Sequence, residues 1–225
     1  GTTDEAPGSR APRRLSILPR GRAAMISAIL LAAGESRRMG RPKQLLPWQG
    51  KTLLQHCLET VLRSDADEVV LVLGYQADLI RKVLPPLPVK IVTNPDFNRG
   101  MAASLRCGLL AMDPGSEAFL VFLADQPGIA PETVNTLIRR FRQADPKRGI
   151  VRPVYRGQGG HPVLMAARYL QEALQLQGDE GARRILLNHP GDILEVPLDH
   201  DAVLKDIDTP DQYRAYGDGS GPDGS

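Results

Sequence analysis

The sequence lacks paired cysteines, long apolar runs and a surplus of one charge, and each absence excludes a class of protein. Its 225 residues include two cysteines, Cys57 and Cys107, which have neither the paired spacing of a zinc site nor the framework of a disulfide-rich domain. We therefore expect reduced, buried thiols, which favours a cytoplasmic protein. No apolar stretch approaches the roughly 18 residues that cross a bilayer, so we expect no membrane partner.

The formal net charge is only +2, and its distribution argues against nucleic-acid binding. Residues 1–24 contain five arginines against Asp4 and Glu5, which gives +3, and residues 218–225 contain two aspartates. Subtracting these two ends leaves +1 for residues 25–217. A nucleic-acid binder would need a broad basic face, and the folded part has too little positive charge for one.

The two ends of the chain differ in composition from the middle. Residues 1–24 contain three prolines, three glycines and no aromatic residue, and they are predicted to form a disordered basic tail. Residues 217–225, GDGSGPDGS, are predicted to form a flexible tail. We expect residues 25–216 to form a single domain, a length that supports a sizeable core.

Within residues 25–216, short apolar runs alternate with segments of helical period. Strands are expected at 26–32, 68–74, 89–94, 118–125, 149–155, 161–165 and 192–198, and helices at 51–64, 76–84, 101–112, 131–143, 167–176, 180–189 and 209–216. This pattern predicts an α/β, Rossmann-like, mostly parallel sheet flanked by helices. The mixed second half is expected to add a small β-rich lobe over the carboxyl edge of the sheet, where ligands bind in such folds.

A glycine-bearing basic loop, LLAAGESRRMGRPKQLLPWQG (30–50), follows the first strand but fits neither familiar phosphate signature. Gly34 and Gly40 are separated by five residues and Lys43 precedes Gln44, so the P-loop pattern fails. The pattern G-x-G-x-x-G also fails, which disfavours a nicotinamide dehydrogenase.

The same loop still has the chemistry of a phosphate site. Ala32, Ala33 and Gly34 have small side chains, so backbone N–H groups can come close to a ligand. The cationic side chains that follow can bind several phosphate oxygens; they are Arg37, Arg38, Arg41 and Lys43. The alternative is a solvated basic loop that merely joins a strand to a helix.

The helix expected at 101–112 offers a second anchor for a polar ligand. Gly100, Met101 and Ala102 place free N–H groups at its start, and Ser104 adds a hydroxyl one turn on. The alternative is an ordinary helix start capped by Asn98.

Aspartates near two segment ends suggest a cation site. Asp125 ends an apolar strand at the carboxyl edge, and Asp206 and Asp208 are spaced to share one face of an extended segment. One or two carboxylates together with substrate phosphates are the usual ligands of Mg²⁺. The alternatives are that Asp125 caps the following helix and that Asp208 caps the helix near Pro210.

The turn GQGGHP (157–162) lies between two expected strands. It is either an ordinary hairpin turn or part of a ligand site, and the single histidine, His161, is poor evidence for catalysis.

Six segments in order resemble the nucleotidyltransferases of the molybdenum-cofactor type, and most closely the molybdenum cofactor cytidylyltransferases. They are LAAGESRRMGRPKQLLP, NRGMAASLRCGL, LADQPGIAPETV, GQGGHPVL, GDEGARRIL and DIDTPDQY, and they cover residues 26–216. The resemblance implies the fold of the nucleotide-diphospho-sugar transferases.

The resemblance also implies roles for individual residues. The residues that it implies for nucleotide binding are Leu31, Ala32, Ala33, Gly34, Arg38, Lys43, Gly100 and Ser104. Arg38, Lys43 and Asp125 are the expected catalytic residues, Asp125 and Asp208 the Mg²⁺ ligands, and Gln126, Gly160 and His161 the acceptor site.

The activity that the resemblance implies is transfer of CMP from CTP to the terminal phosphate of molybdopterin, with release of pyrophosphate. The alanine at position 33, in LAAG rather than LAGG, implies cytidine. Three alternatives stay open: GTP as donor, another phosphorylated acceptor, and a non-catalytic carrier that inserts molybdenum cofactor. Where molybdenum cofactor is the acceptor or the cargo, a molybdenum hydroxylase is the expected client.

Overall fold

The computed structural model describes residues 24–217. The predicted tails therefore lie, apart from Ala24 and Gly217, outside the described residues. Within residues 24–217, no helix has the length and apolar character needed to cross a membrane. Both cysteines of this part are free, and Cys57 is fully buried with its Sγ 3.5 Å from the Ala124 carbonyl.

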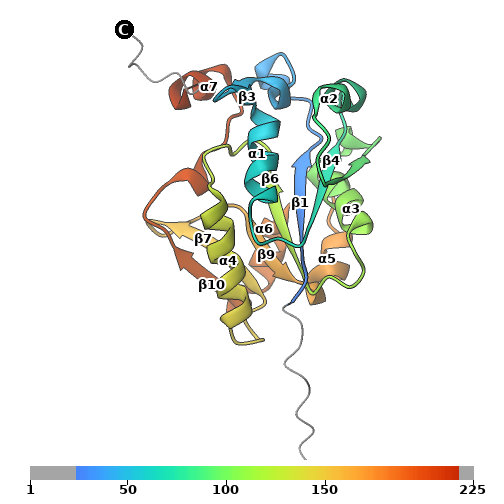
Figure 1. Cartoon of the computed structure of the whole chain (residues 1–225). Helices are drawn as coiled ribbons and strands as arrows, with labels where there is room; N and C mark the ends of the chain where they lie inside the picture. The colour runs from blue at the N-terminus through green and yellow to red at the C-terminus, as the bar shows by residue number, and fades with distance from the viewer. Residues whose placement is uncertain (1–23, 218–225) are drawn as a thin grey trace, which may run out of the picture.

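One mostly parallel sheet organises the fold (Figure 1). Its strands run in the order β10-β7-β9-β6-β1-β4-β5, and β8 pairs with β7 outside this path. Along the path only β9 is antiparallel to its neighbours, β6 and β7. The bounds are β1 Ile26–Ala32, β4 Glu68–Leu73, β5 Lys90–Thr93, β6 Ala118–Leu123, β7 Ile150–Tyr155, β8 Gln158–Gly159, β9 Val163–Ala166 and β10 Ile193–Pro197.

Helices cover both faces of this sheet, as the predicted fold class requires (Figure 1). One face packs against α1 (Leu53–Leu62), α2 (Ala77–Val83) and α4 (Pro131–Gln143), and the other against α3 (Met101–Ala111), α5 (Leu170–Leu174) and α6 (Ala182–Asn188). The last helix, α7 (Pro210–Tyr216), lies at the carboxyl edge near the small hairpin of β2 (Pro47–Trp48) and β3 (Lys51–Thr52).

The central strand β1 shows why the sheet is buried on both sides. Ile26, Ala28 and Leu30 belong to one core cluster, whereas Ile29 and Leu31 belong to the other. Successive side chains of a strand point to opposite faces, so a continuous apolar run supplies two cores at once.

The predicted strands and helices are all present, with ends shifted by no more than three residues. The second half differs from the prediction in one respect. Its strands β7, β9 and β10 continue the main sheet beyond β6 instead of forming a separate lobe over the carboxyl edge. Apolar periodicity identifies a strand but not its neighbour, so the sequence left this pairing open.

Gly108 on α3 provides a test of this packing. A Cβ at this position would lie 2.4 Å from Ile29 Cγ2 and 2.9 Å from Val72 Cγ2, so the helix lies directly on the sheet. We expect Gly108→Val to lower the free energy of unfolding by about 1–3 kcal/mol through overpacking. Urea unfolding measures this, with Gly191→Val as the control because no atom lies within 4 Å of a Cβ there. Equal stability of the two variants would contradict the packing.

Candidate active site

The loop after β1 is held in shape by a buried glutamine that sequence reasoning did not identify. Gln44, 2% exposed, donates from Nε2 to the carbonyls of Ala32, at 2.9 Å, and Gly34, at 3.1 Å. Ser36, at φ 56°, accepts from the backbone N–H of Lys43 at 3.0 Å. These contacts fold the loop back on itself, and Lys43 begins a short 3₁₀ helix, η2 (Lys43–Leu45), beside the end of β1.

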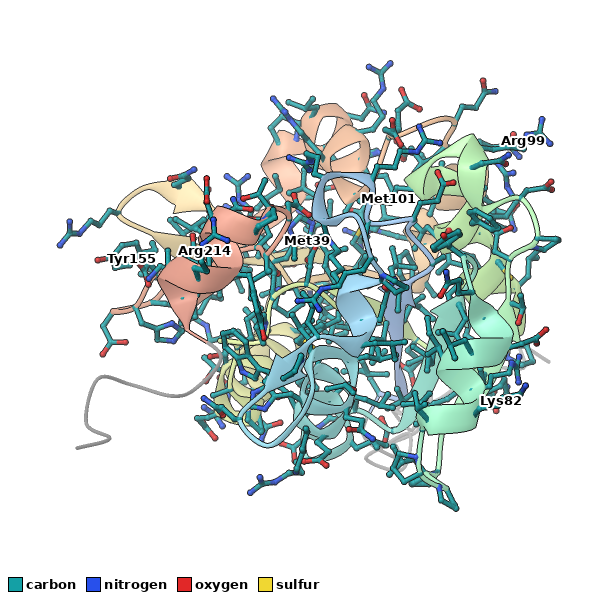
Figure 2. The ribbon with its side chains drawn as sticks, turned by 90° about the horizontal axis from the view of Figure 1, so that it is seen from above. Met39, Lys82, Arg99, Met101, Tyr155 and Arg214 are labelled. Atoms are coloured by element: carbon teal, nitrogen blue, oxygen red, sulfur yellow. The ribbon has the colours of Figure 1, made fainter. Side chains whose placement is uncertain are left out.

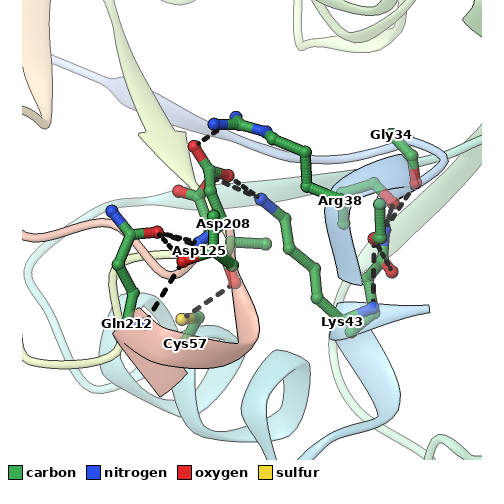
Figure 3. Close-up of polar contacts among 12 residues, drawn as sticks. Gly34, Arg38, Lys43, Cys57, Asp125, Asp208 and Gln212 are labelled. Atoms are coloured by element: carbon green, nitrogen blue, oxygen red, sulfur yellow. Dashed lines mark hydrogen bonds and ion pairs between the residues drawn. The ribbon is translucent and has the colours of Figure 1, made fainter. Parts of the chain in front are cut away.

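The Lys43 ammonium lies between two carboxylates from distant parts of the chain (Figure 3). Its Nζ is 2.8 Å from Asp125 Oδ2, just beyond β6, and 2.6 Å from Asp208 Oδ1, just before α7. Arg38 reaches the other oxygen of Asp208, with Nη2 2.8 Å from Oδ2. The structure thus brings together all four of the predicted catalytic and metal-binding side chains.

Contacts within this cluster shift the pKa values of Lys43 and Asp208 toward their charged forms. Burial by itself would lower the pKa of Lys43, but Asp125 and Asp208 outweigh it, and the net shift is upward. Burial by itself would raise the pKa of Asp208, but Lys43 and Arg38 lower it overall. Burial and the nearby charges of Asp125 and Asp208 raise the pKa of Asp206.

The two oxygens of the Asp125 carboxylate have different surroundings, and Oδ2 is the one that contacts Lys43. Its Oδ1 is buried and has no hydrogen-bond partner among the described residues. Within residues 24–217, no three His, Cys, Asp or Glu side chains converge as a preformed metal site. Lys43 instead supplies the positive charge between the two predicted metal ligands.

The alternative role of Asp208 as a helix cap is wrong. Thr209 caps α7, because its side chain accepts from the N–H of Gln212 at 3.2 Å. The Asp208 side chain is therefore free for Lys43 and Arg38, while its backbone N–H donates to Gln212 Oε1 at 2.8 Å.

The start of α3 is partly different from the prediction. The N–H of Ala102 is not free, since it donates to the Gly178 carbonyl at 2.9 Å. Ser104 is buried and pairs with Asn94, whose Nδ2 lies 3.0 Å from the Ser104 Oγ. Asn98 does not cap the helix; Gly100, at φ 96°, occupies the cap position.

Two adjoining cavities open beside this cluster. The inner one has a volume of about 380 Å³ and the outer one about 580 Å³. The predicted nucleotide-binding and metal-binding residues that line the inner cavity are Leu31, Ala32, Ala33, Gly34, Arg38, Lys43, Gly100, Ser104, Asp125 and Asp208. Gln44, Phe97 and Asp179 also line this cavity, and sequence reasoning did not identify them. Met101 and Asp206, which the sequence analysis named at the helix start and beside Asp208, line it as well.

The three predicted acceptor-binding residues lie elsewhere and share one neighbour, Val203. Gln126 is buried and its Nε2 lies 3.4 Å from the Val203 carbonyl, to which the His161 N–H also donates, at 3.0 Å. A Cβ on Gly160 would lie 2.2 Å from the same oxygen. None of the three lines either cavity, and their acceptor-binding role stays a prediction.

The cluster predicts a specific pH dependence of stability. The pKa of Asp208 is lowered by folding, so its stabilisation is present above the unfolded pKa of about 4 and is lost as pH falls through the folded value. We expect Asp208→Asn to cost on the order of 1 kcal/mol near pH 7, and we expect this difference to shrink below about pH 4.

Urea unfolding at several pH values measures the difference, and Asp211→Asn is the control because that carboxylate is exposed on the same helix. A difference between wild type and Asp208→Asn that stays constant down to pH 3 would contradict the assignment.

Comparison with known proteins supports a nucleotide-transfer site. Residues 28–193 match the family model of the MobA-like NTP transferase domain. The molybdenum cofactor cytidylyltransferase of Escherichia coli (strain K12) is 30% identical, over 84% of this chain and 93% of that protein. The nicotine blue oxidoreductase of Paenarthrobacter nicotinovorans is 34% identical, over 84% of this chain and 95% of that protein.

Solved structures agree with this family. The crystal structure of Rv0371c from Mycobacterium tuberculosis H37Rv has a TM-score of 0.77 and 31% identity, and the match covers 85% of this chain and 97% of that one. The same mycobacterial protein has also been solved in complex with manganese. The chain thus belongs to the family of MobA-like NTP transferase domains and is a nucleotidyltransferase.

Proposed function

We propose that this enzyme transfers CMP from CTP to the terminal phosphate of molybdopterin and releases pyrophosphate. The observation that carries nucleotide transfer is the position of Lys43 between Asp125 and Asp208, beside a small-residue loop that lines a cavity. Cytidine and molybdopterin are supported by the Escherichia coli relative and by Ala33.

The inner cavity fits the nucleoside half of the donor. Leu31, Ala32 and Ala33 give it an apolar wall without bulk, and Gly100 and Ser104 face it from the start of α3. Arg38 and Lys43 line both cavities, and their cationic ends would hold the triphosphate.

The reaction itself needs positioning and charge neutralisation. An oxygen of the acceptor phosphate forms a bond to the α-phosphorus of CTP, and the bond from that phosphorus to the bridging oxygen of the β-phosphate breaks. Pyrophosphate leaves with the bonding electrons, and no covalent protein intermediate is required. Both reactants are anions, so Arg38 and Lys43 lower the barrier by holding them together.

Asp125 and Asp208 would hold a divalent cation, which we propose to be Mg²⁺. The fit rests on the buried, unpartnered Oδ1 of Asp125 and on a second carboxylate that shares its ammonium partner. When bound, the cation supplies positive charge to the phosphates. Lys43, which pairs with both carboxylates in the free protein, is then available for the triphosphate.

Two finer expectations belong to this proposal. The product would pass to a molybdenum hydroxylase as the client enzyme, and the reaction would take place in the cytoplasm. Because a relative at 34% identity is named an oxidoreductase, the assay below includes a reduced nicotinamide cofactor as a separate arm.

The decisive assay is pyrophosphate release from CTP, GTP, ATP and UTP, each with and without molybdopterin, in Mg²⁺ or Mn²⁺. We expect release with CTP only when molybdopterin is present. Release with GTP instead would overturn the choice of donor, and binding of molybdopterin without any turnover would indicate a carrier. Oxidation of the nicotinamide cofactor without pyrophosphate release would overturn the proposal entirely.

Asp125 should be essential for transfer. We expect Asp125→Asn to remain folded and to lose at least about 100-fold in rate, since this carboxylate is the proposed cation ligand with the unpartnered oxygen. Asp211→Asn, at an exposed carboxylate on α7, is the matched control and should keep the wild-type rate. Near-normal transfer by Asp125→Asn would remove the cation site from the mechanism.

Lys43 should act chiefly on donor binding. Loss of its charged contacts to phosphate is expected to weaken CTP binding about tenfold or more in Lys43→Ala. Calorimetric titration measures the dissociation constant. Lys51→Ala is the control, because that lysine pairs with Glu59 at a half-exposed position outside both cavities. Unchanged CTP affinity in Lys43→Ala would contradict the role.

A further inference from the structure

We propose that Asp179 accepts hydrogen bonds from the ribose hydroxyls of the bound nucleotide and thereby selects ribonucleotides. This role rests on the proposed nucleotide site, in which the ribose is the part of the nucleotide that Asp179 would contact. Asp179 lies in the connection between α5 and α6, within the segment GDEG (178–181), far in sequence from the loop after β1.

Contacts with α3 fix this connection in place. The Gly178 carbonyl accepts from the N–H of Ala102 at 2.9 Å. Arg106, one turn further along α3, donates from Nε to the Leu174 carbonyl at 3.0 Å and from Nη2 to the Leu176 carbonyl at 2.8 Å. The backbone that leads to Asp179 is thus anchored to α3 at three carbonyls.

Two glycines make this close approach sterically possible. A Cβ on Gly100, at φ 96°, would lie 2.3 Å from the Gly178 carbonyl oxygen and 2.9 Å from the Asp179 nitrogen. A Cβ on Gly181 would lie 2.9 Å from the Met101 sulfur. Met101, labelled in Figure 2, marks the start of α3 on the upper face of the molecule, and Arg99 lies farther out on the same side.

Asp179 faces the site without a partner. It lines both cavities, together with Gly34, Arg38 and Gly100. Among residues 24–217 its carboxylate makes no hydrogen bond or ion pair, whereas Asp125 and Asp208 are both held by Lys43. An ionised carboxylate only accepts hydrogen bonds, so its ligand must offer donors.

The ribose is the part of a nucleotide that fits this position. The phosphates carry no hydrogen-bond donors and would be repelled by a carboxylate. In the proposed site they bind to Arg38 and Lys43 instead. The base belongs with Ala33 and Ser104 in the inner cavity. The ribose connects these two parts, so it passes the rim, where the exposed Asp179 borders both cavities. An acidic residue on the ribose hydroxyls is also the solution used in dinucleotide-binding folds.

The test is equilibrium binding of CTP and 2′,3′-dideoxy-CTP to the full chain and its variants. We expect the wild type to bind CTP about tenfold more tightly than the dideoxy analogue, since hydrogen bonds to a charged group are lost. Asp179→Ala should bind CTP about tenfold more weakly than the wild type does, whereas its affinity for the dideoxy analogue should change little. The ratio of the two dissociation constants should therefore approach one in this variant. Titration with 2′-deoxy-CTP and 3′-deoxy-CTP then identifies the hydroxyl.

Glu180→Gln is the matched control. Glu180 is the neighbouring carboxylate, it lines neither cavity, and this variant should keep the wild-type affinity for both nucleotides. Asp179→Asn keeps an acceptor oxygen without the charge and should retain part of the discrimination. A thermal melt of each variant separates loss of binding from loss of folding.

Other outcomes identify what has failed. If Asp179→Ala keeps the wild-type preference for CTP, or loses affinity for both nucleotides equally, the ribose assignment is overturned while the nucleotide site stands. If Asp179→Ala binds CTP normally but no longer accepts molybdopterin, the residue serves the acceptor and the inference is overturned. If the wild type binds no nucleoside triphosphate, the proposed function fails and the inference fails with it.

Discussion

The site depends on one ammonium group that lies between two carboxylates and pairs with both. Asp125 and Asp208 are largely buried at the carboxyl edge of the sheet, and two like charges this close would repel each other without a cation between them. Lys43 supplies that cation and thereby holds β6, α7 and the loop after β1 in one arrangement. In the proposed reaction the same charge would also hold the triphosphate, so one side chain would serve both the structure and the catalysis.

The sheet explains why these groups meet. Strands β1 and β6 are parallel neighbours, so the segments that follow them emerge at the same edge, and α7 returns to that edge from the other end of the chain. The connection 178–181 approaches from the side of α3 and closes the remaining wall. Five stretches of sequence thus line the paired cavities, namely residues 31–44, 97–104, 123–125, 178–179 and 206–208.

Much of the fold could be predicted from the sequence, and so could the charged groups that meet at the site, because local sequence patterns indicate both. Apolar runs identified the buried strands, and small residues followed by cations identified the loop after β1. What the sequence could not show depends on contacts between distant residues. The Ala102 N–H donates to the carbonyl of Gly178, which lies 76 positions away in the sequence. Gln44 shapes the loop after β1 through two backbone carbonyls, and nothing in the sequence distinguishes it from an ordinary polar residue. The pairing of β9 with β6, which joins the second half to the main sheet, was missed for the same reason.

The central claim is that this chain moves the α-phosphate of CTP, with its nucleoside, onto the phosphate of molybdopterin. The most direct measurement is to supply CTP labelled at the α-phosphate together with molybdopterin and Mg²⁺, and to follow the label. The account predicts that the label appears in a pterin–cytidine dinucleotide in step with pyrophosphate. Label that stays in CTP, or that appears only as free CMP through hydrolysis, would contradict the account.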